Sequence, residues 1–196
     1  MKKGIANNQT MEMPPGIYEY LLVASPDADT AARVMAEKQF FSAQFNKPIA
    51  AKTKPHITVA SFLATEPMEE TIMRWMHRVI SAKQCFTVTL DQYGAFRPHT
   101  IYLKVQDHQP FRDLARGLRV LDQFIQGYGC PKMHLVDNAH LTIARQLDAL
   151  TYRAAVQCYS QKNFAASFPV QELVLLRRKD QFDACRQLTI FRLRPM

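Results

Sequence analysis

Two five-residue segments of this chain repeat one pattern, and that pattern restricts how the chain can fold. Residues 56–60 read His-Ile-Thr-Val-Ala, and residues 140–144 read His-Leu-Thr-Ile-Ala. In a β-strand alternate side chains share a face, so each segment turns its histidine and threonine to one side and two aliphatic residues to the other. The two histidines, at positions 56 and 140, are 84 residues apart, which predicts two separate half-buried strands.

The same spacing recurs along the chain. Apolar periodicity predicts elements that begin near residues 17, 56, 66 and 86, and a second set that begins near residues 99, 140, 148 and 170, so that partners are 82–84 residues apart. The expected strands include residues 84–91, residues 140–147 and one strand over residues 170–177. A constant separation indicates an internal duplication with a pseudo-two-fold axis. Such an axis brings the two motif strands face to face across a groove.

Paired imidazoles suggest a chemistry. Histidine is the general acid or base suited to neutral pH, and two histidines can carry both proton transfers of a phosphodiester cleavage. The alternative, that each histidine is an ordinary polar residue on an exposed strand face, stays open, although the matched pair argues against it.

Length, charge and cysteine spacing limit the class of protein. The 196 residues predict a flexible N-terminal tail (1–16) and a single bilobal domain (17–196), with lobes near 17–97 and 98–196. We expect a cytoplasmic monomer without a membrane partner, because no apolar run approaches the ~20 residues of a membrane span and the N-terminus lacks a signal-peptide pattern. The net charge of +8 favours an anionic partner, although a generally basic soluble protein has the same charge. The four cysteines and six histidines form no metal-ligand pattern, so we expect neither a metal nor a cofactor.

The motifs and their flanks resemble a known family. Residues 54–59 (K-P-H-I-T-V) and 139–145 (A-H-L-T-I-A-R) are similar to the two H-x-T-x motifs of the two-histidine phosphoesterase superfamily, and within it to the LigT-like 2′-5′ RNA ligases or 2′,3′-cyclic phosphodiesterases. Residues 93–98 resemble that family's loop between central strands, and residues 172–177 resemble its late strand. The family often has a serine after that strand, where this chain has Arg177-Arg178.

The resemblance implies a bilobal α+β fold, in which two mostly antiparallel sheets face a central cleft and helices lie outside. It also implies metal-independent chemistry on RNA or nucleotides, at a 2′,3′-cyclic phosphate or a 2′-5′ bond, including the reverse ligation. The expected catalytic residues are His56, Thr58, His140 and Thr142. One imidazole takes a proton, the other gives one, and the threonine hydroxyls donate hydrogen bonds to the phosphate oxygens. Which histidine is the acid is not fixed by the sequence.

Four further residues are candidates for substrate binding. Lys54 lies two residues before His56 and is a candidate phosphate ligand, with a solvated loop lysine as the alternative. Arg145 is another, although regular alternation from His140 places it on the opposite face. Tyr102 and Phe96 are candidates to stack on a base, with core packing as the alternative. Two other functions stay open: a non-catalytic RNA- or nucleotide-binding module, and a hydrolase of another small cyclic or 2′-linked phosphate.

Overall fold

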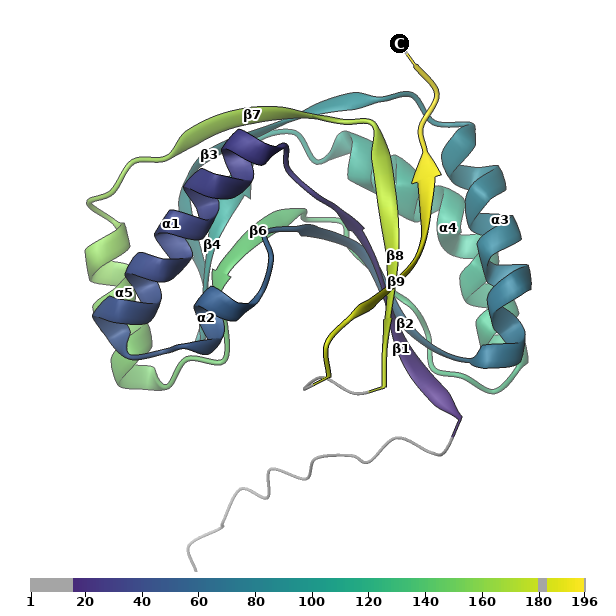
Figure 1. Ribbon diagram of the computed structural model, residues 1–196, viewed down its shortest axis with the longest axis horizontal. Helices are drawn as coiled ribbons and strands as arrows, with labels where there is room; N and C mark the ends of the chain where they lie inside the picture. The colour runs from purple at the N-terminus through teal and green to yellow at the C-terminus, as the bar shows by residue number, and fades with distance from the viewer. Residues whose placement is uncertain (1–15, 180–182, 196) are drawn as a thin grey trace, which may run out of the picture.

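The protein is represented by a computed structural model that describes residues 16–179 and 183–195, so the expected tail lies outside the described residues apart from Gly16. These residues form an α+β fold with a mostly antiparallel sheet and five α-helices (Figure 1). The strands are β1 (Ile17–Ala24), β2 (Ile57–Thr65), β3 (Phe86–Phe96), β4 (Thr100–Val105), β5 (His134–Leu135), β6 (His140–Ala144), β7 (Ala165–Val170), β8 (Glu172–Arg178) and β9 (Arg186–Arg192). The helices are α1 (Ala28–Phe45), α2 (Ile49–Lys52), α3 (Glu69–Ser81), α4 (Gln109–Gly127) and α5 (Ala149–Tyr159), and a 3₁₀ turn, η1 (Glu66–Met68), leads into α3.

The strand order has two-fold character. The order is β7-β3-β4-β6-β2-β1-β8-β9, with β5 paired to β2. The motif strands β6 and β2 lie at its centre, and β4 and β1 flank them. β1 begins at 17 and β4 at 100, while β2 begins at 57 and β6 at 140, a separation of 83 residues in both cases. The arrangement agrees with the duplication that the sequence predicts.

The prediction of two separate sheets is wrong. β2 and β6 are joined by the antiparallel pair Ile57–Leu141, so the ladders form one sheet of nine strands. That pair lies at the pseudo-two-fold centre, where the two halves of the sheet meet.

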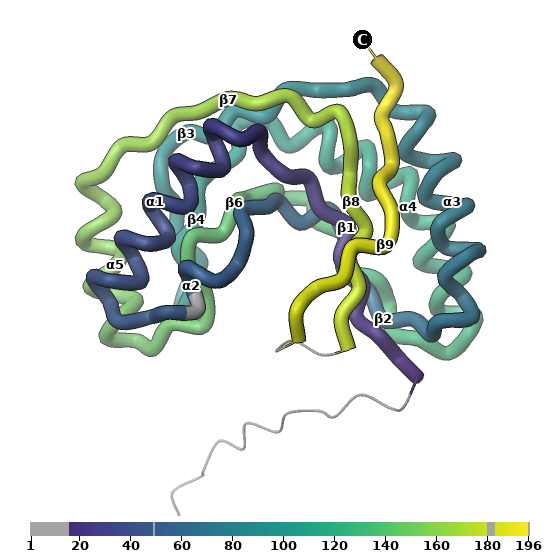
Figure 2. The backbone as a smooth tube through the Cα atoms, viewed as in Figure 1, coloured from purple at the N-terminus to yellow at the C-terminus, as the bar shows by residue number. Residues whose placement is uncertain are grey.

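Helices cover the outer face of each half. α1 and α5 contact β4, β6 and β7, whereas α3 and α4 contact β2 and β9 (Figure 1). α1 follows β1 in the chain but packs over the other half of the sheet, as the tube in Figure 2 shows. Each half therefore takes elements from both the first and the second segment of the chain. No helix among the described residues has the length and apolar character needed to cross a membrane.

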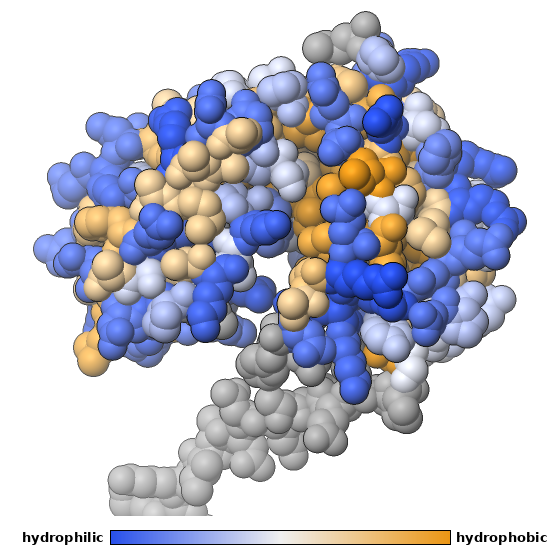
Figure 3. Space-filling model, in the orientation of Figure 1, coloured by the Kyte–Doolittle hydropathy of each residue, from blue (hydrophilic) through white to orange (hydrophobic). Residues whose placement is uncertain are grey.

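The motif strands bury their aliphatic side chains toward these helices. Ile57, Val59, Leu141 and Ile143 are fully buried, as the alternation predicts, whereas the histidine and threonine of each motif are only partly buried. The polar face of the motifs therefore lies on the inner side of the sheet. Figure 3 shows that the molecular surface is hollowed between the two halves; we call this hollow the central groove.

Three strand boundaries differ from the sequence prediction. The expected strand over residues 170–177 is two strands, β7 and β8, separated by Gln171. β3 continues to Phe96 through an irregularity between Leu90 and Tyr93. β6 ends at Ala144 instead of Leu147, because Gln146 takes a left-handed conformation (φ 57°) that a regular strand cannot accommodate.

Candidate active site

The two motifs lie side by side on one face of the sheet. Because Ile57 pairs with Leu141 in antiparallel register, His56 comes opposite Thr142 and Thr58 comes opposite His140. The two histidines are thus diagonal neighbours on adjacent strands, with Cα atoms on the order of 7–8 Å apart. Side chains on one face at this spacing can both reach a single phosphate group, which accepts hydrogen bonds of about 2.8 Å.

Each imidazole is held by the same backbone contact. Nδ1 of His56 lies 2.9 Å from the carbonyl oxygen of Lys54, and Nδ1 of His140 lies 3.0 Å from that of Asn138. A carbonyl oxygen only accepts hydrogen bonds, so both Nδ1 atoms carry the proton and donate it. The Nε2 atom of each ring is therefore the one left to exchange protons with a substrate. This tautomer follows from the hydrogen-bond network.

Both histidines favour the neutral form. Burial lowers the pKa of His56, the hydrogen bond to Lys54 opposes this effect, and the charges of Lys38, Arg145 and Arg178 lower the pKa further. Burial also lowers the pKa of His140, again opposed by its backbone bond, and His108 and His134 add to the lowering. In the free protein both rings are thus neutral at neutral pH, and a bound anionic phosphate favours the protonated form of either ring.

An aromatic wall lies beside His140. Tyr102 comes opposite Thr142, and its ring stacks on Phe96 with centroids 4.1 Å apart. Both rings meet His140 edge-on, at 4.9 Å for Phe96 and 5.2 Å for Tyr102. Phe96 is 39% exposed, which leaves ring surface for a further stacking partner. The structure therefore brings these two sequence-predicted residues to the second motif.

Gly94 makes room for this wall. It lies opposite Tyr102 on β3, and a Cβ atom there would come within 2.5 Å of the Tyr102 ring. Only glycine lets the ring lie over the strand backbone at this point.

The two other substrate-binding candidates occupy different positions. The side chain of Lys54 is exposed in the segment before β2, and its backbone carbonyl is the partner of His56. Arg145 is exposed directly after β6, so the alternation that predicts its orientation does not extend to it. Its positive charge acts on both His56 and Lys38.

The two arginines at the end of β8 face opposite sides of the sheet. Arg177 pairs with Tyr20 and forms ion pairs with Glu66 and Glu69, on the helix side. Arg178 is on the inner face, where its guanidinium donates two hydrogen bonds, of 2.7 and 2.8 Å, to the carboxylate of Glu19. Arg178 thus places a positive charge near His56.

Sequence reasoning did not identify Lys38 as part of this region. Lys38 is only 3% exposed, and its Nζ donates hydrogen bonds to Thr53 Oγ1 (2.8 Å) and to the carbonyl oxygen of Thr142 (3.3 Å). A signal was present in the sequence: Thr30, Val34, Lys38 and Phe41 follow the spacing of one buried helix face. A lysine in such a row indicates a buried cation.

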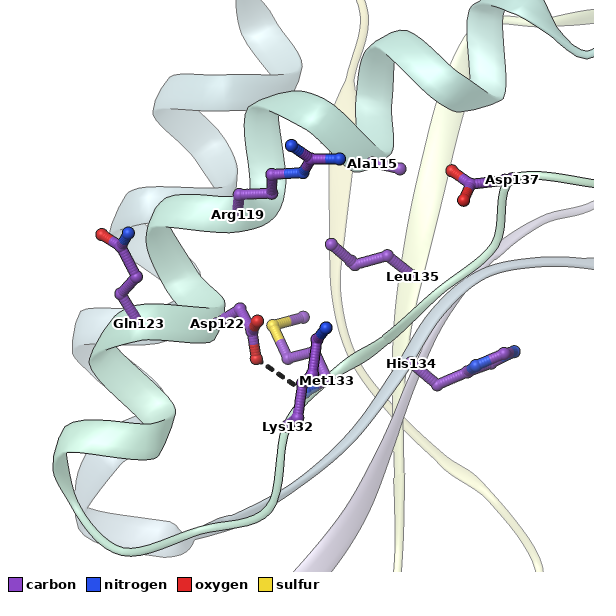
Figure 4. A pocket seen from close by; sticks show the side chains of 9 residues that line it. All are labelled: Ala115, Arg119, Asp122, Gln123, Lys132, Met133, His134, Leu135 and Asp137. Atoms are coloured by element: carbon purple, nitrogen blue, oxygen red, sulfur yellow. Dashed lines mark hydrogen bonds between the residues drawn. The ribbon is translucent and has the colours of Figure 1, made fainter.

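A cavity outside the motifs lies beside α4. It has a volume of about 680 Å³ between α4 and residues 132–137, and neither motif histidine lines it (Figure 4). Arg119 and Lys132 line it together with Asp122 and Asp137, so its charge is mixed, and Asp122 already accepts a hydrogen bond from the Met133 backbone. We therefore place the candidate active site at the paired motifs. Within the described ranges, no group of three or more histidine, cysteine, aspartate or glutamate residues could hold a metal ion.

Comparisons with solved structures show the fold. The Escherichia coli LigT structure with 3′-AMP superposes with a TM-score of 0.62 at 19% identity, over 90% of this chain and 98% of LigT. The structure of LigT with NADP⁺ gives 0.63 at 19% identity, with the same coverage. The Thermus thermophilus protein TT0787 gives 0.65 at 18% identity, also over 90% of this chain and 98% of TT0787. The fold is therefore LigT-like.

Sequence comparison gives the family. A search of curated proteins finds no match to this chain. The family model for the 2′-5′ RNA ligase superfamily, however, matches residues 26–181, which include both motifs. The chain belongs to the 2′-5′ RNA ligase superfamily of LigT-like, two-histidine phosphoesterases.

Proposed function

We propose that this protein is a metal-independent phosphodiesterase that acts on RNA or nucleotides with a 2′,3′-cyclic phosphate or a 2′-5′ linkage, and that can run the reverse ligation. The observation that carries this proposal is the pairing of Ile57 with Leu141, which puts two imidazoles of the same tautomer on one face. Escherichia coli LigT has been solved in complex with 3′-AMP, NADP⁺ and ATP, which supports a nucleotide-like substrate for this chain. We further propose that the protein acts in the cytoplasm, as a monomer without a cofactor.

The proposed reaction needs two proton transfers. Nε2 of one neutral imidazole takes a proton from water as the water oxygen attacks phosphorus. Nε2–H of the other imidazole, protonated when the anionic phosphate is bound, gives its proton to the ribose oxygen as the P–O bond breaks. In ligation a ribose hydroxyl replaces water as the nucleophile: the same imidazole takes its proton, and the other imidazole protonates the ribose oxygen released when the P–O bond of the cyclic phosphate breaks.

Neighbouring residues support this reaction. The hydroxyls of Thr58 and Thr142 donate hydrogen bonds to the non-bridging oxygens as negative charge builds. Phe96, with its exposed ring face, stacks on a base next to the phosphate. Arg145 attracts the phosphate, and Lys54 adds positive charge at the entrance to the groove.

The experiment is a turnover assay in EDTA with 2′,3′-cyclic nucleotides and 2′-5′ dinucleotides as substrates. We expect hydrolysis by the natural protein and by His77→Ala, an exposed histidine of α3 that serves as the matched control, but not by His56→Ala or His140→Ala. Nucleotide binding without turnover would identify a binding module of the same fold. Turnover restored only by added divalent ion would replace the mechanism with a metal-assisted one.

A further inference from the structure

Lys38 occupies a core position that ordinarily excludes a charge. It belongs to the buried row of α1 with Thr30, Val34 and Phe41, and only 3% of its surface is exposed. Lysine is almost never fully buried unless it is paired. No carboxylate contact with its ammonium group is found among the described residues; its hydrogen bonds go to a hydroxyl and a carbonyl oxygen. The position thus retains a buried positive charge with neutral partners.

One of these partners lies on the segment that leads into the first motif, and the other belongs to the second motif. Thr53 lies three residues before His56, on the segment that leads into β2, and Thr142 is the threonine of the second motif. The register between β2 and β6 consists of the single pair Ile57–Leu141, so few backbone hydrogen bonds hold the motifs together. Lys38 supplies a link between them from the helix side, because α1 crosses from β1 to cover β6.

The duplicated position carries the opposite charge. The buried residues Leu114, Leu118, Asp122 and Ile125 of α4 follow Thr30, Val34, Lys38 and Phe41 at 84 residues, the separation of the two histidines. Asp122 accepts a 2.7 Å hydrogen bond from the Met133 backbone, on the segment that leads to the second motif. The two equivalent helices, α1 and α4, therefore each hold the segment that leads into one motif. α1 does so with a lysine and α4 with an aspartate.

The charges around the two imidazoles differ accordingly. His56 faces Lys38 from α1, Arg145 from the end of β6 and Arg178 from β8, all cationic, with the Lys54 carbonyl at its Nδ1. His140 faces His108 and His134, the Asn138 carbonyl and the rings of Phe96 and Tyr102. Lys104 comes opposite His140 in the register, but its side chain is exposed to solvent. The cation-rich surroundings oppose protonation of the His56 ring.

We propose that Lys38 is a positioning residue of this site: its ammonium group ties the two motifs together, and its charge assigns His56 the role of general base and His140 that of general acid in hydrolysis. This inference rests on the proposed function, since it names which of the two histidines takes the proton from water.

The test compares Lys38→Met, Lys38→Arg and Val34→Ala in the full chain. Val34→Ala is the matched control, because it opens a cavity one turn away on the same buried face without changing charge. Proton NMR of the imidazole rings in the free protein gives the pKa of each histidine, and steady-state kinetics gives kcat and KM separately. In Lys38→Met we expect the pKa of His56 to rise while that of His140 stays, and kcat to fall roughly 10-fold with KM little changed. In Lys38→Arg the pKa of His56 should equal that of the natural protein. Val34→Ala should lower the free energy of unfolding without changing the pKa of either histidine.

A measurement on the natural protein covers the case in which Lys38→Met does not fold. Burial, followed by the charge of Arg145, lowers the pKa of Lys38 to about 8. The ring signals of His56 should then show a second inflection near pH 8, in step with the ¹³Cε signal of Lys38, and the signals of His140 should not. The inference is overturned if that inflection is absent. It is also overturned if Lys38→Met changes neither the pKa of His56 nor kcat. Because the NMR readouts need no substrate, these failures differ from a failure of the proposed function, in which His56→Ala and His140→Ala keep full turnover.

Discussion

Backbone carbonyl groups orient both motif histidines. Each motif histidine donates Nδ1–H to the carbonyl oxygen two residues before it, so the two rings present Nε2 in the same way. Each threonine follows its histidine on the same face and comes opposite the other histidine across the strand pair. The proposed site therefore consists of four side chains, which come from β6 and from the start of β2.

The threonine hydroxyls can be tested with an isosteric change. We expect Thr58→Val and Thr142→Val each to lower kcat roughly 10²-fold, because each removes one donor to the developing charge on phosphate. Both side chains are only partly buried, so the melting temperature should change little. Steady-state kinetics measures kcat of both variants, and thermal unfolding measures their melting temperatures. An unchanged kcat in both variants would show that the threonine hydroxyls do not take part in the mechanism.

Lys38 should also affect stability in a pH-dependent way. Its pKa is about 8 in the folded protein against 10.5 for an ordinary lysine, so between these values the unfolded chain binds more protons and the free energy of unfolding rises with pH. The charged form at pH 7 therefore destabilises the fold, by at most about 3 kcal/mol. Urea unfolding of the natural protein and of Lys38→Met should show that the natural protein gains stability relative to the variant from about pH 8 to 10. A difference that does not depend on pH would contradict this.

For single residues, the sequence predicts which side chains are buried where strand alternation determines their orientation. The burial of Ile57, Val59, Leu141 and Ile143 follows from strand periodicity, and the structure confirms it. The burial of Lys38 depends on α1 packing over the half of the sheet that does not contain β1, and no local pattern specifies that crossing. The sequence names Arg145 as a candidate, but alternation from His140 places it on the opposite face, and β6 ends before alternation reaches it.

Among secondary-structure elements, β3 and β4 set the aromatic wall beside His140. Gly94 and Tyr102 are paired across these strands, and the absence of a Cβ atom lets the Tyr102 ring contact both Phe96 and His140. The glycine therefore determines how closely the wall approaches the second motif.

Gly94→Ala should displace that wall. A Cβ 2.5 Å from a rigid ring forces the ring or the strand to move, so we expect a loss of roughly 1–3 kcal/mol in the free energy of unfolding and a shift of the His140 ring signals. Gly127→Ala at the end of α4 is the control, since no atom lies within 4 Å of its added Cβ, and its stability should hold or rise slightly. Equal effects of the two changes, by denaturant unfolding and NMR, would show that the close approach does not matter.

The strands that the sequence does not predict depend on their place in the assembled sheet. β7 contains Pro169, which argues against a strand in the sequence, yet β7 lies at the edge of the sheet, where a missing backbone N–H is tolerated. The two-residue strand β5 is too short to give an alternating pattern and is fixed by its pairing with β2. Edge position and pairing partner are properties of the assembled sheet, which a single segment does not encode.

The whole molecule is one sheet folded into two halves around the motif pair. Ile57 and Leu141 are fully buried at the join, and the buried core extends continuously through both halves. Each half takes strands from both segments of the chain. Neither half can thus form from one segment alone.

This interleaving predicts a single cooperative unfolding transition. Far-UV circular dichroism and the fluorescence of the lone tryptophan, Trp75, should report the same midpoint in denaturant, because neither half persists without the other. Ile57→Ala at the join should shift both signals together, by about 2–5 kcal/mol. Two separated transitions would instead indicate independent lobes near residues 17–97 and 98–196.

The central claim is that His56 and His140 act together on one phosphate. Turnover of a 2′,3′-cyclic nucleotide in EDTA by His56→Ala, His140→Ala and the double variant, with His77→Ala as control, tests it most directly. We predict that each single change lowers kcat by on the order of 10²–10⁴ and that the double variant loses far less than the product of the two effects, because the pair works as a unit. Single variants that fold and retain nearly full turnover would contradict the account.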